Sequence, residues 1–249
     1  MTTQLSVNLN KIALLRNARG RNYPSVTDFA TQVLESDAIG VTMHPRPDER
    51  HARRSDIYEL AELLIDYPGK ELNIEGNPTD EFMKLVLDIK PHQCTLVPDD
   101  PEQITSDHGW NLNQDMTLVK STVNRLTDAG IRSSIFMDPT ASDMSLASET
   151  GTDRIELYTE SYAESYTEAD SDEILKQYQD TALAAQSFDM GVNAGHDLNL
   201  ENLEKFLTSV YDVKEVSIGH AITVESLYYG FQYTLNKYLE ILKRVNQEI

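Results

Sequence analysis

The sequence is poor in cysteine and has no long apolar run. Cys94 is the one cysteine among 249 residues, so neither an internal disulfide nor a CxxC metal or redox motif can form. No apolar run approaches the roughly 20 residues that span a bilayer, and the first 20 residues lack the apolar stretch of a signal peptide. We therefore expect a cytoplasmic protein that makes no use of a membrane.

Positive charge is also scarce, and its distribution is uneven. The chain carries 21 Lys and Arg against 41 Asp and Glu, a net charge of −20. This balance argues against nucleic acid as a partner, because phosphate polymers need clustered cations. The first 54 positions nevertheless hold eight cations, Lys11, Arg16, Arg19, Arg21, Arg46, Arg50, Arg53 and Arg54. Such a cluster is either a solvated basic face or a binding site for a small anion.

Short apolar segments alternate with longer stretches of helical periodicity. The apolar segments begin at Leu5, Ile39, Glu71, Gln93, Arg132, Arg154, Gly191 and Glu215. Eight βα units spaced by roughly 30 residues are typical of the (β/α)8 or TIM barrel. Because no linker or repeat divides the chain, we predict a single TIM-barrel domain over residues 1–249.

The stretches between these segments have the spacing and capping residues of helices. Ser25 and Asp28 form a capping-box-like pair ahead of an apolar stripe that reaches Leu34. Phe82 to Ile89 repeats this pattern and ends at Lys90-Pro91. Further stripes follow at 119–126, 174–182 and 203–207, and a weaker helix is expected at 142–148. The final helix carries five aromatic residues between 228 and 238, which either pack on the barrel or form a subunit interface.

Two connections depart from the regular pattern. Residues 98–113 form a long βα connection, which is either a lid over the barrel mouth or a disordered surface loop. Residues 160–173 are strongly acidic and are expected to form a solvated turn followed by a helix start, with no role in chemistry.

The ends of the predicted strands are unusually polar. In a TIM barrel these ends meet at one mouth, where the active site lies. The residues at the strand ends are Asn8, Asn10, Lys11, His44, Arg46, Glu75, Glu156, Asn193, His196, Gly219 and His220. One such His or Glu is commonly structural, but several at the same ends would be unfavourable to bury without partners. The combination favours a polar reaction chamber.

Several familiar catalytic motifs are missing. The chain has no HExxH or GxSxG motif, no Rossmann fingerprint and no P-loop. Cys94 sits in a predicted strand, where a buried thiol is usual, and a metal held by separate strands remains an open alternative. Phosphate binding has better support, because the last two strands end in Gly195-His196-Asp197 and Gly219-His220. The Arg-rich early loops can hold a second anion, which gives a site for two phosphorylated molecules.

The motifs are specific when they are taken together and in order. They are VNLNKIALLRNARG from Val7, VTMHPRPDERH from Val41, LNIEG, TLVPD, RIELYT, VNAGHDL and VSIGHA. Over nearly the whole chain, this series resembles the pyridoxine 5'-phosphate synthase family. The resemblance implies a TIM barrel with extra helices, assembled as a homo-oligomer, an octamer, that works without metal or organic cofactor. It also implies condensation of 3-amino-2-oxopropyl phosphate with 1-deoxy-D-xylulose 5-phosphate, with release of inorganic phosphate and water.

The resemblance also implies roles for individual residues. His44 and Glu75 would be proton acceptors, His196 a proton donor, and Glu156 a supporting residue. The amino ketone phosphate would be held by Asn8, Arg19, Gly219 and His220. The deoxyxylulose phosphate would be held by Arg46, His51 and Thr105.

Two positions depart from the pattern of many family members. Asn10-Lys11 stands where many members have Asp-His, and Lys11 can still offer a cation to phosphate. Asp197 stands where many members have Gly, and a carboxylate beside phosphate is unfavourable. We therefore expect Asp197 to contact substrate through its backbone N–H, with its side chain turned away.

Two other functions are compatible with a phosphate-binding barrel. A phosphosugar aldolase or epimerase would need a Schiff-base lysine at a strand end or a metal, and Lys11 is the candidate lysine. A non-catalytic phosphosugar-binding protein would tolerate the loss of His44, Glu75 or His196, yet all three are present.

Overall fold

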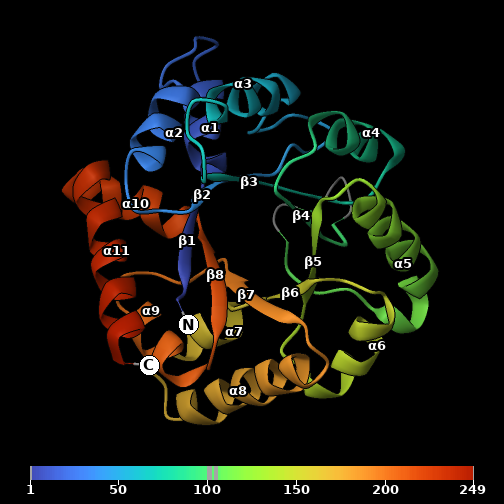
Figure 1. Cartoon of the computed structure of the whole chain (residues 1–249). Coiled ribbons are helices and arrows are strands. Elements are labelled where there is room, and N and C mark those ends of the chain that lie inside the picture. The colour runs from blue at the N-terminus through green and yellow to red at the C-terminus, as the bar shows by residue number, and fades with distance from the viewer. Residues whose placement is uncertain (1, 100–102, 104–105, 249) are drawn as a thin grey trace.

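The structure is a closed barrel of eight parallel strands ringed by helices (Figure 1). It is a computed structural model that describes residues 2–99, 103 and 106–248. The strands are β1 (Gln4–Asn8), β2 (Gly40–Met43), β3 (Glu71–Gly76), β4 (Gln93–Leu96), β5 (Arg132–Met137), β6 (Arg154–Leu157), β7 (Gly191–Gly195) and β8 (Val213–Ile218). Each predicted strand is present, so the TIM-barrel prediction is confirmed. The prediction that residues 1–249 form one domain stays a prediction.

Helices follow the strands around the outside of the barrel. They are α1 (Asn10–Asn17), α2 (Val26–Leu34), α3 (Arg54–Leu64), α4 (Asp80–Ile89), α5 (Leu112–Asp128), α6 (Met144–Glu149), α7 (Glu160–Ser165), α8 (Ser171–Ser187), α9 (Leu203–Ser209), α10 (His220–Tyr229) and α11 (Phe231–Glu248). A short 3-10 turn, Ala141–Asp143, leads into α6. Within the described residues, no helix has the length and apolar character needed to cross a membrane.

Local capping explains where the predicted helices begin and end. The Ser25 hydroxyl accepts a hydrogen bond from the Asp28 N–H at 3.1 Å, which starts α2. Lys90 takes the left-handed conformation at φ 52° and ends α4 before Pro91. We expected one final helix, but the structure has two, because Gly230 at φ 85° separates α10 from α11.

Parallel pairing closes the barrel between its first and last strands. The register runs from Ser6 opposite Gly40 on one side of β1 to Gln4 opposite Glu215 on the other. Alternate residues of β1, such as Leu5 and Val7, are fully buried against the helices. The residues between them face the barrel interior, because side chains alternate along a strand.

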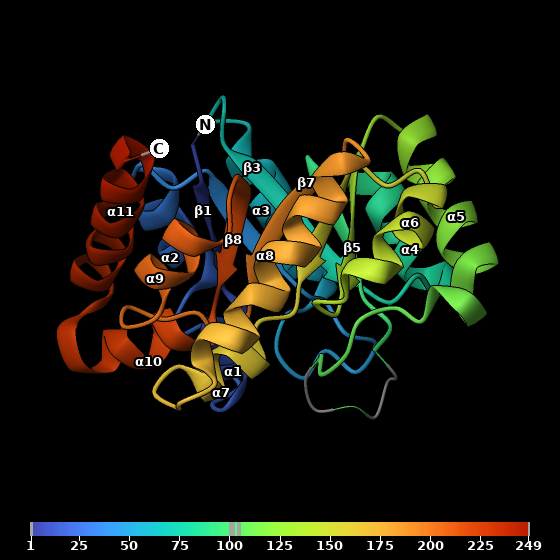
Figure 2. The ribbon, with the colours of Figure 1, turned by 90° about the horizontal axis from the view of Figure 1, so that it is seen from below.

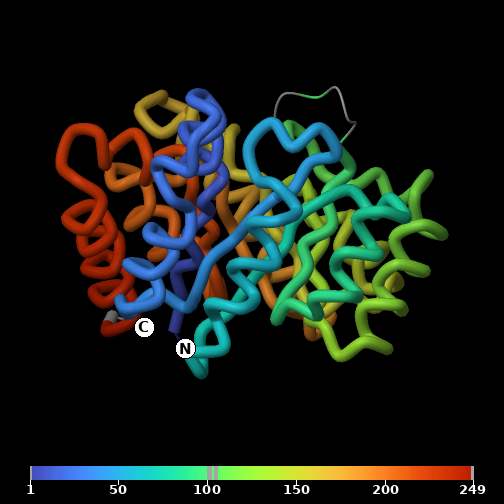
Figure 3. The backbone as a smooth tube through the Cα atoms, turned by 90° about the horizontal axis from the view of Figure 1, so that it is seen from above, coloured from blue at the N-terminus to red at the C-terminus, as the bar shows by residue number. Residues whose placement is uncertain are grey.

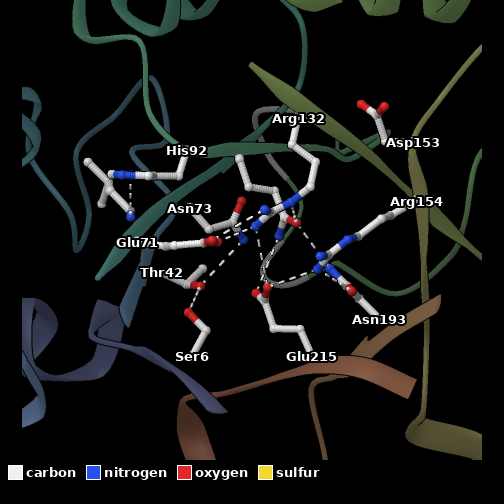
Figure 4. Close-up of polar contacts among 12 residues, drawn as sticks. Ser6, Thr42, Glu71, Asn73, His92, Arg132, Asp153, Arg154, Asn193 and Glu215 are labelled. Atoms are coloured by element: carbon white, nitrogen blue, oxygen red, sulfur yellow. Dashed lines mark hydrogen bonds and ion pairs between the residues drawn. The ribbon is translucent and has the colours of Figure 1, made fainter. Parts of the chain in front are cut away.

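The barrel interior is polar where many barrels are aliphatic (Figure 4). Near the N-terminal ends of the strands, Arg132 pairs with Glu71, and Arg154 Nη1 lies 3.3 Å from Glu215 Oε2. Asn193, which we expected at the mouth, lies in this layer instead and accepts a hydrogen bond from Arg154 at 3.1 Å. It faces inward two residues before β7 ends, which is too deep to reach the mouth.

The two ends of the barrel differ in what they carry. The two termini lie at one end, and α1 and α7 lie at the other, as two opposite side views show (Figures 2 and 3). The strands point toward the end with α1 and α7, which is where the loops that follow each strand gather (Figure 2).

Candidate active site

A cavity of about 370 Å³ opens at the C-terminal ends of the strands. Its wall consists of Asn8, Asn10, Lys11, His44, Arg46, His51, Glu75, Ser106, Glu156, Tyr158, Glu160, His196, Asp197, Ser217, Gly219 and His220. Besides Asn193, which lies deeper in the barrel, only two of the predicted site residues are missing from this wall among the described residues. Arg19 is exposed in the turn after α1 and does not line the cavity, because α1 ends at Asn17. Thr105 lies outside the described residues.

The first strand positions its neighbours through two asparagines. Asn8 Oδ1 accepts a hydrogen bond from the Asn10 N–H at 3.0 Å. Asn10 Oδ1 in turn accepts from the His44 N–H at 2.9 Å, which ties the ends of β1 and β2 together. We had expected Lys11 at the end of a strand. It lies instead in the first turn of α1, because the helix begins at Asn10. From there its ammonium acts electrostatically on both His51 and His196.

Glu75 is a buried carboxyl group at the end of β3. Asn8 Nδ2 donates a hydrogen bond to Glu75 Oε2 at 3.3 Å. Burial, followed by the negative charges of Asp99 and Glu215, raises the pKa of Glu75 to about 8. A carboxylate with raised basicity suits removal of a proton from carbon.

Glu156 faces the same cavity from β6. Gly195 makes room for it, since a Cβ at Gly195 would lie 3.1 Å from Glu156 Oε1. Burial, then the charge of Glu75, raises the pKa of Glu156 well above its usual value. Among the described residues, Glu156 Oε2 is buried without a hydrogen-bond partner. Buried polar atoms that lack partners at a cavity wall are groups available to a ligand.

Three of the four histidines on the cavity wall, His44, His51 and His196, have pKa values below the ordinary value for histidine. Burial and nearby cations place the pKa of His44 well below its ordinary value, and that of His51 at about 4. The pKa of His196 is also about 4, chiefly because of burial, although Asp99 and Glu160 oppose the shift. A neutral imidazole accepts protons directly. His196 can donate a proton once an anionic substrate raises its pKa.

His196 is oriented by aromatic neighbours and by its own backbone. Its ring lies 5.2 Å from the Phe136 ring and 5.6 Å, edge to face, from the Tyr158 ring. Its φ of 60° is in the left-handed region, which non-glycine residues seldom adopt. Such strain is found where the surrounding structure holds a side chain in a functional direction.

Arg46 lines the cavity but already has partners. It forms a buried ion pair with Asp99, and its Nη1 donates to the Gln103 carbonyl at 2.6 Å. Ser106 Oγ also donates to Asp99, at 2.7 Å. The connection after β4 therefore reaches the cavity, while its motion as a lid stays a prediction.

The start of α10 offers a phosphate-binding element. Gly219 caps this ten-residue helix, and His220 is its first residue. A Cβ at Gly219 would lie 2.8 Å from Asn8 Cβ, so glycine lets β8 and β1 approach each other. Free N–H groups and the helix dipole attract anions at such a terminus.

Four residues of the cavity wall were missed by the sequence analysis. They are Ser106, Tyr158, Glu160 and Ser217. Tyr158 and Glu160 follow the end of β6, which is the signal that could have found them. Residues 160–173 were expected to have no chemistry, yet Glu160 accepts a hydrogen bond from the Tyr158 hydroxyl inside the cavity.

The structure offers neither a cysteine nucleophile on the cavity wall nor a metal site among the described residues. Cys94 is buried in β4, away from the cavity wall, and burial raises the pKa of its thiol. In the described ranges, no three His, Cys, Asp or Glu side chains are grouped so that they could hold a metal ion.

Solved structures share this fold at low sequence identity. The tryptophan synthase alpha chain from Legionella pneumophila gives a TM-score of 0.67 at 11% identity, over 97% of this chain and 92% of that one. Thiamine phosphate pyrophosphorylase from Pyrococcus furiosus gives a TM-score of 0.60 at 14% identity, over 97% of this chain and 96% of that one. Identities this low support the fold alone.

Closer relatives are found among characterised sequences. The pyridoxine 5'-phosphate synthase of Parabacteroides distasonis is 49% identical over 236 residues, which are 95% of this chain and 97% of the relative. The pyridoxine 5'-phosphate synthase of Bacteroides fragilis is 47% identical over 241 residues, which are 97% of this chain and 100% of the relative. A family profile described as "Pyridoxal phosphate biosynthesis protein PdxJ" matches residues 5–244. The resemblance found in the sequence is thereby confirmed, and the chain belongs to the PdxJ family of pyridoxal phosphate biosynthesis proteins.

Proposed function

We propose that the chain is a pyridoxine 5'-phosphate synthase. It condenses 3-amino-2-oxopropyl phosphate with 1-deoxy-D-xylulose 5-phosphate and releases inorganic phosphate and water. Membership of the family supports this assignment. The observation that carries it is the meeting of Glu75, His44 and His196 on the wall of one cavity.

The reaction asks for several acid and base steps in one chamber. An amine attacks a ketone, water leaves, carbon-bound protons are removed, and phosphate is eliminated before the ring becomes aromatic. Glu75, with its pKa near 8, and neutral His44 serve as proton acceptors. His196 serves as the donor after it has gained a proton in the presence of the anionic substrates. Glu156, buried and short of one hydrogen-bond partner, supports the reacting atoms.

Two phosphate subsites divide the binding residues. The start of α10, at Gly219 and His220, receives the phosphate of the amino ketone beside Asn8. The cations Lys11 and Arg46, together with the neutral His51, form the side that receives the deoxyxylulose phosphate. The predicted contacts of Arg19 and Thr105 stay predictions.

Turnover of purified protein tests this function. The protein, stripped of metal by a chelator, is incubated with both substrates, and pyridoxine 5'-phosphate and inorganic phosphate are measured. We expect equal amounts of the two products. Failure to form pyridoxine 5'-phosphate would refute the assignment. Cleavage or epimerisation of the deoxyxylulose phosphate alone would favour the aldolase or epimerase alternative, and binding without any reaction would favour the binding protein.

We also propose that the protein works as a homo-oligomer. The α10–α11 region exposes a patch of large apolar side chains, Leu227 (75%), Tyr228 (80%), Tyr229 (62%) and Tyr233 (54%). Patches of this kind commonly mark subunit interfaces. Light scattering on the eluting protein would give its mass, and Tyr228→Ser combined with Tyr229→Ser should lower that mass. A wild-type monomer would refute the proposal.

A further inference from the structure

Two carboxylates stand on the β6–β7 side of the catalytic cavity. Glu160 is the first residue of α7, and the Tyr158 hydroxyl donates a hydrogen bond to it. Asp197 follows His196 directly after β7. Both are half-buried, and both line the cavity. The expectation that the Asp197 side chain turns away from bound phosphate stays a prediction.

These two carboxylates have no cationic partner in the described part of the chain. The ion pairs found there include neither Glu160 nor Asp197. Burial raises the pKa of Asp197, the charge of Glu160 raises it further, and His220 opposes the shift. Two like charges held near each other in a partly dry site repel, and a bound cation would relieve that repulsion.

A second observation points to a ligand on the same wall. Glu156 Oε2 is buried and lacks a hydrogen-bond partner among the described residues, and Glu156 lines this cavity. Glu156 precedes Tyr158 on the chain by two residues, so it faces the cavity from the same segment as Glu160. The polar groups of this wall therefore need a ligand that can satisfy them.

The two proposed substrates differ in one charged group. Both are phosphate esters of small ketones, so a purely cationic site would not tell them apart. Only the amino ketone also carries an amine, which is an ammonium ion at neutral pH. The charges of the cavity match this difference. The cations Lys11 and Arg46 come from the β1–β2 side, and the carboxylates Glu160 and Asp197 come from the β6–β7 side.

We propose that Glu160 and Asp197 form an ammonium subsite that admits the amino ketone phosphate and rejects the amine-free phosphosugar. This inference rests on the proposed function. Tyr158 fixes Glu160 through its hydroxyl, and Glu156 and Ser217 satisfy the polar atoms next to the amine. Sorting by charge places each phosphate ester at its own end of the cavity before the carbon–nitrogen bond forms.

Binding of one substrate at a time tests the subsite without turnover. Calorimetry compares 3-amino-2-oxopropyl phosphate with dihydroxyacetone phosphate, in which a hydroxyl replaces the ammonium. The wild type should prefer the amino compound by about 10-fold or more, the scale of a hydrogen bond to a charged group. The isosteric double variant Glu160→Gln with Asp197→Asn should lose most of that preference. The single variant Asp197→Asn, a milder change, should lose part of it.

Glu164→Gln is the matched control. Glu164 lies one turn further along α7, is exposed and does not line the catalytic cavity, so its variant should keep the preference. In steady-state kinetics, the double variant should raise KM for the amino ketone and leave KM for the deoxyxylulose phosphate nearly unchanged. An unchanged preference in a double variant that still makes product would overturn the subsite alone. A wild type that neither makes product nor binds either compound would overturn the subsite and the proposed function together.

Discussion

Asn8 and Glu75 are joined across the mouth of the barrel by a hydrogen bond of 3.3 Å. The donor comes from the end of β1 and the acceptor from the end of β3. Burial and the charges of Asp99 and Glu215 raise the pKa of Glu75, whereas a hydrogen bond with Ser217 lowers it. The bond from Asn8 also favours the charged form, because it is donated to the carboxylate. The balance leaves a carboxyl group that titrates near neutral pH.

Glu75→Gln should abolish most of the synthase activity. Glutamine keeps the shape of the side chain but cannot accept a proton, so kcat should fall by roughly 10²-fold or more. KM for both substrates should change much less, because the amide fills the same space. Steady-state kinetics of product formation measures both quantities. A variant with wild-type kcat would remove Glu75 from the mechanism.

The pH dependence of kcat/KM should report the raised pKa of Glu75. A general base works in its deprotonated form, so activity should rise with pH, reach half of its maximum near pH 8 and level off above that. Asn8→Ala removes a donor that favours the carboxylate. The variant should therefore shift the rising part of the pH profile to higher pH by about half a unit. If kcat/KM falls in the variant but rises over the same pH range as in the wild type, Asn8 acts on the substrate and not through Glu75.

His196→Ala should also lower kcat by about 10²-fold, since it removes the proposed proton donor. His108→Ala is the control, because His108 is exposed and does not line the cavity. Small acids such as imidazole, added to the reaction, should restore part of the activity of the His196 variant. Equal rates in the two variants would contradict the assignment.

The sequence predicted the barrel and most of its mouth for one physical reason. A TIM barrel needs eight short apolar segments, and the polar residues at their ends, such as His44 and Glu75, must share one rim. Position along a strand therefore translates directly into position in space.

The misses have equally physical causes. Glu160 belongs to an acidic run that reads as a solvated surface, and only the bond from Tyr158 shows that this side chain turns inward. Lys11 was assigned to a strand end, but α1 begins one residue earlier, at Asn10. Residues 228–238 were assigned to one final helix, and only the φ of 85° at Gly230 shows the break. Each of these three features depends on the direction of the backbone or of a side chain, and the apolar periodicity of a sequence carries no information about that direction.

The interior ion pair between Arg154 and Glu215 gives a prediction about stability (Figure 4). The Glu215 side chain is 4% exposed. In Arg154→Leu, this buried carboxylate would keep the hydrogen bond from the neutral Gln93 and the more distant cation Arg132, whose Nη2 lies 3.8 Å away. We expect the free energy of unfolding to fall by about 3 kcal/mol, as when one partner of a buried pair is removed. Urea denaturation at pH 7 measures the change.

Adding Glu215→Gln to Arg154→Leu should recover part of that stability, because the uncompensated charge is then absent. Arg244→Leu provides the comparison, since its pair with Glu204 lies on the surface and both side chains are more than 40% exposed. Loss of an exposed pair should change stability by less than about 1 kcal/mol. If Arg154→Leu were no more damaging than Arg244→Leu, the interior charges would be solvated in the folded protein, and the barrel would owe little of its stability to their pairing.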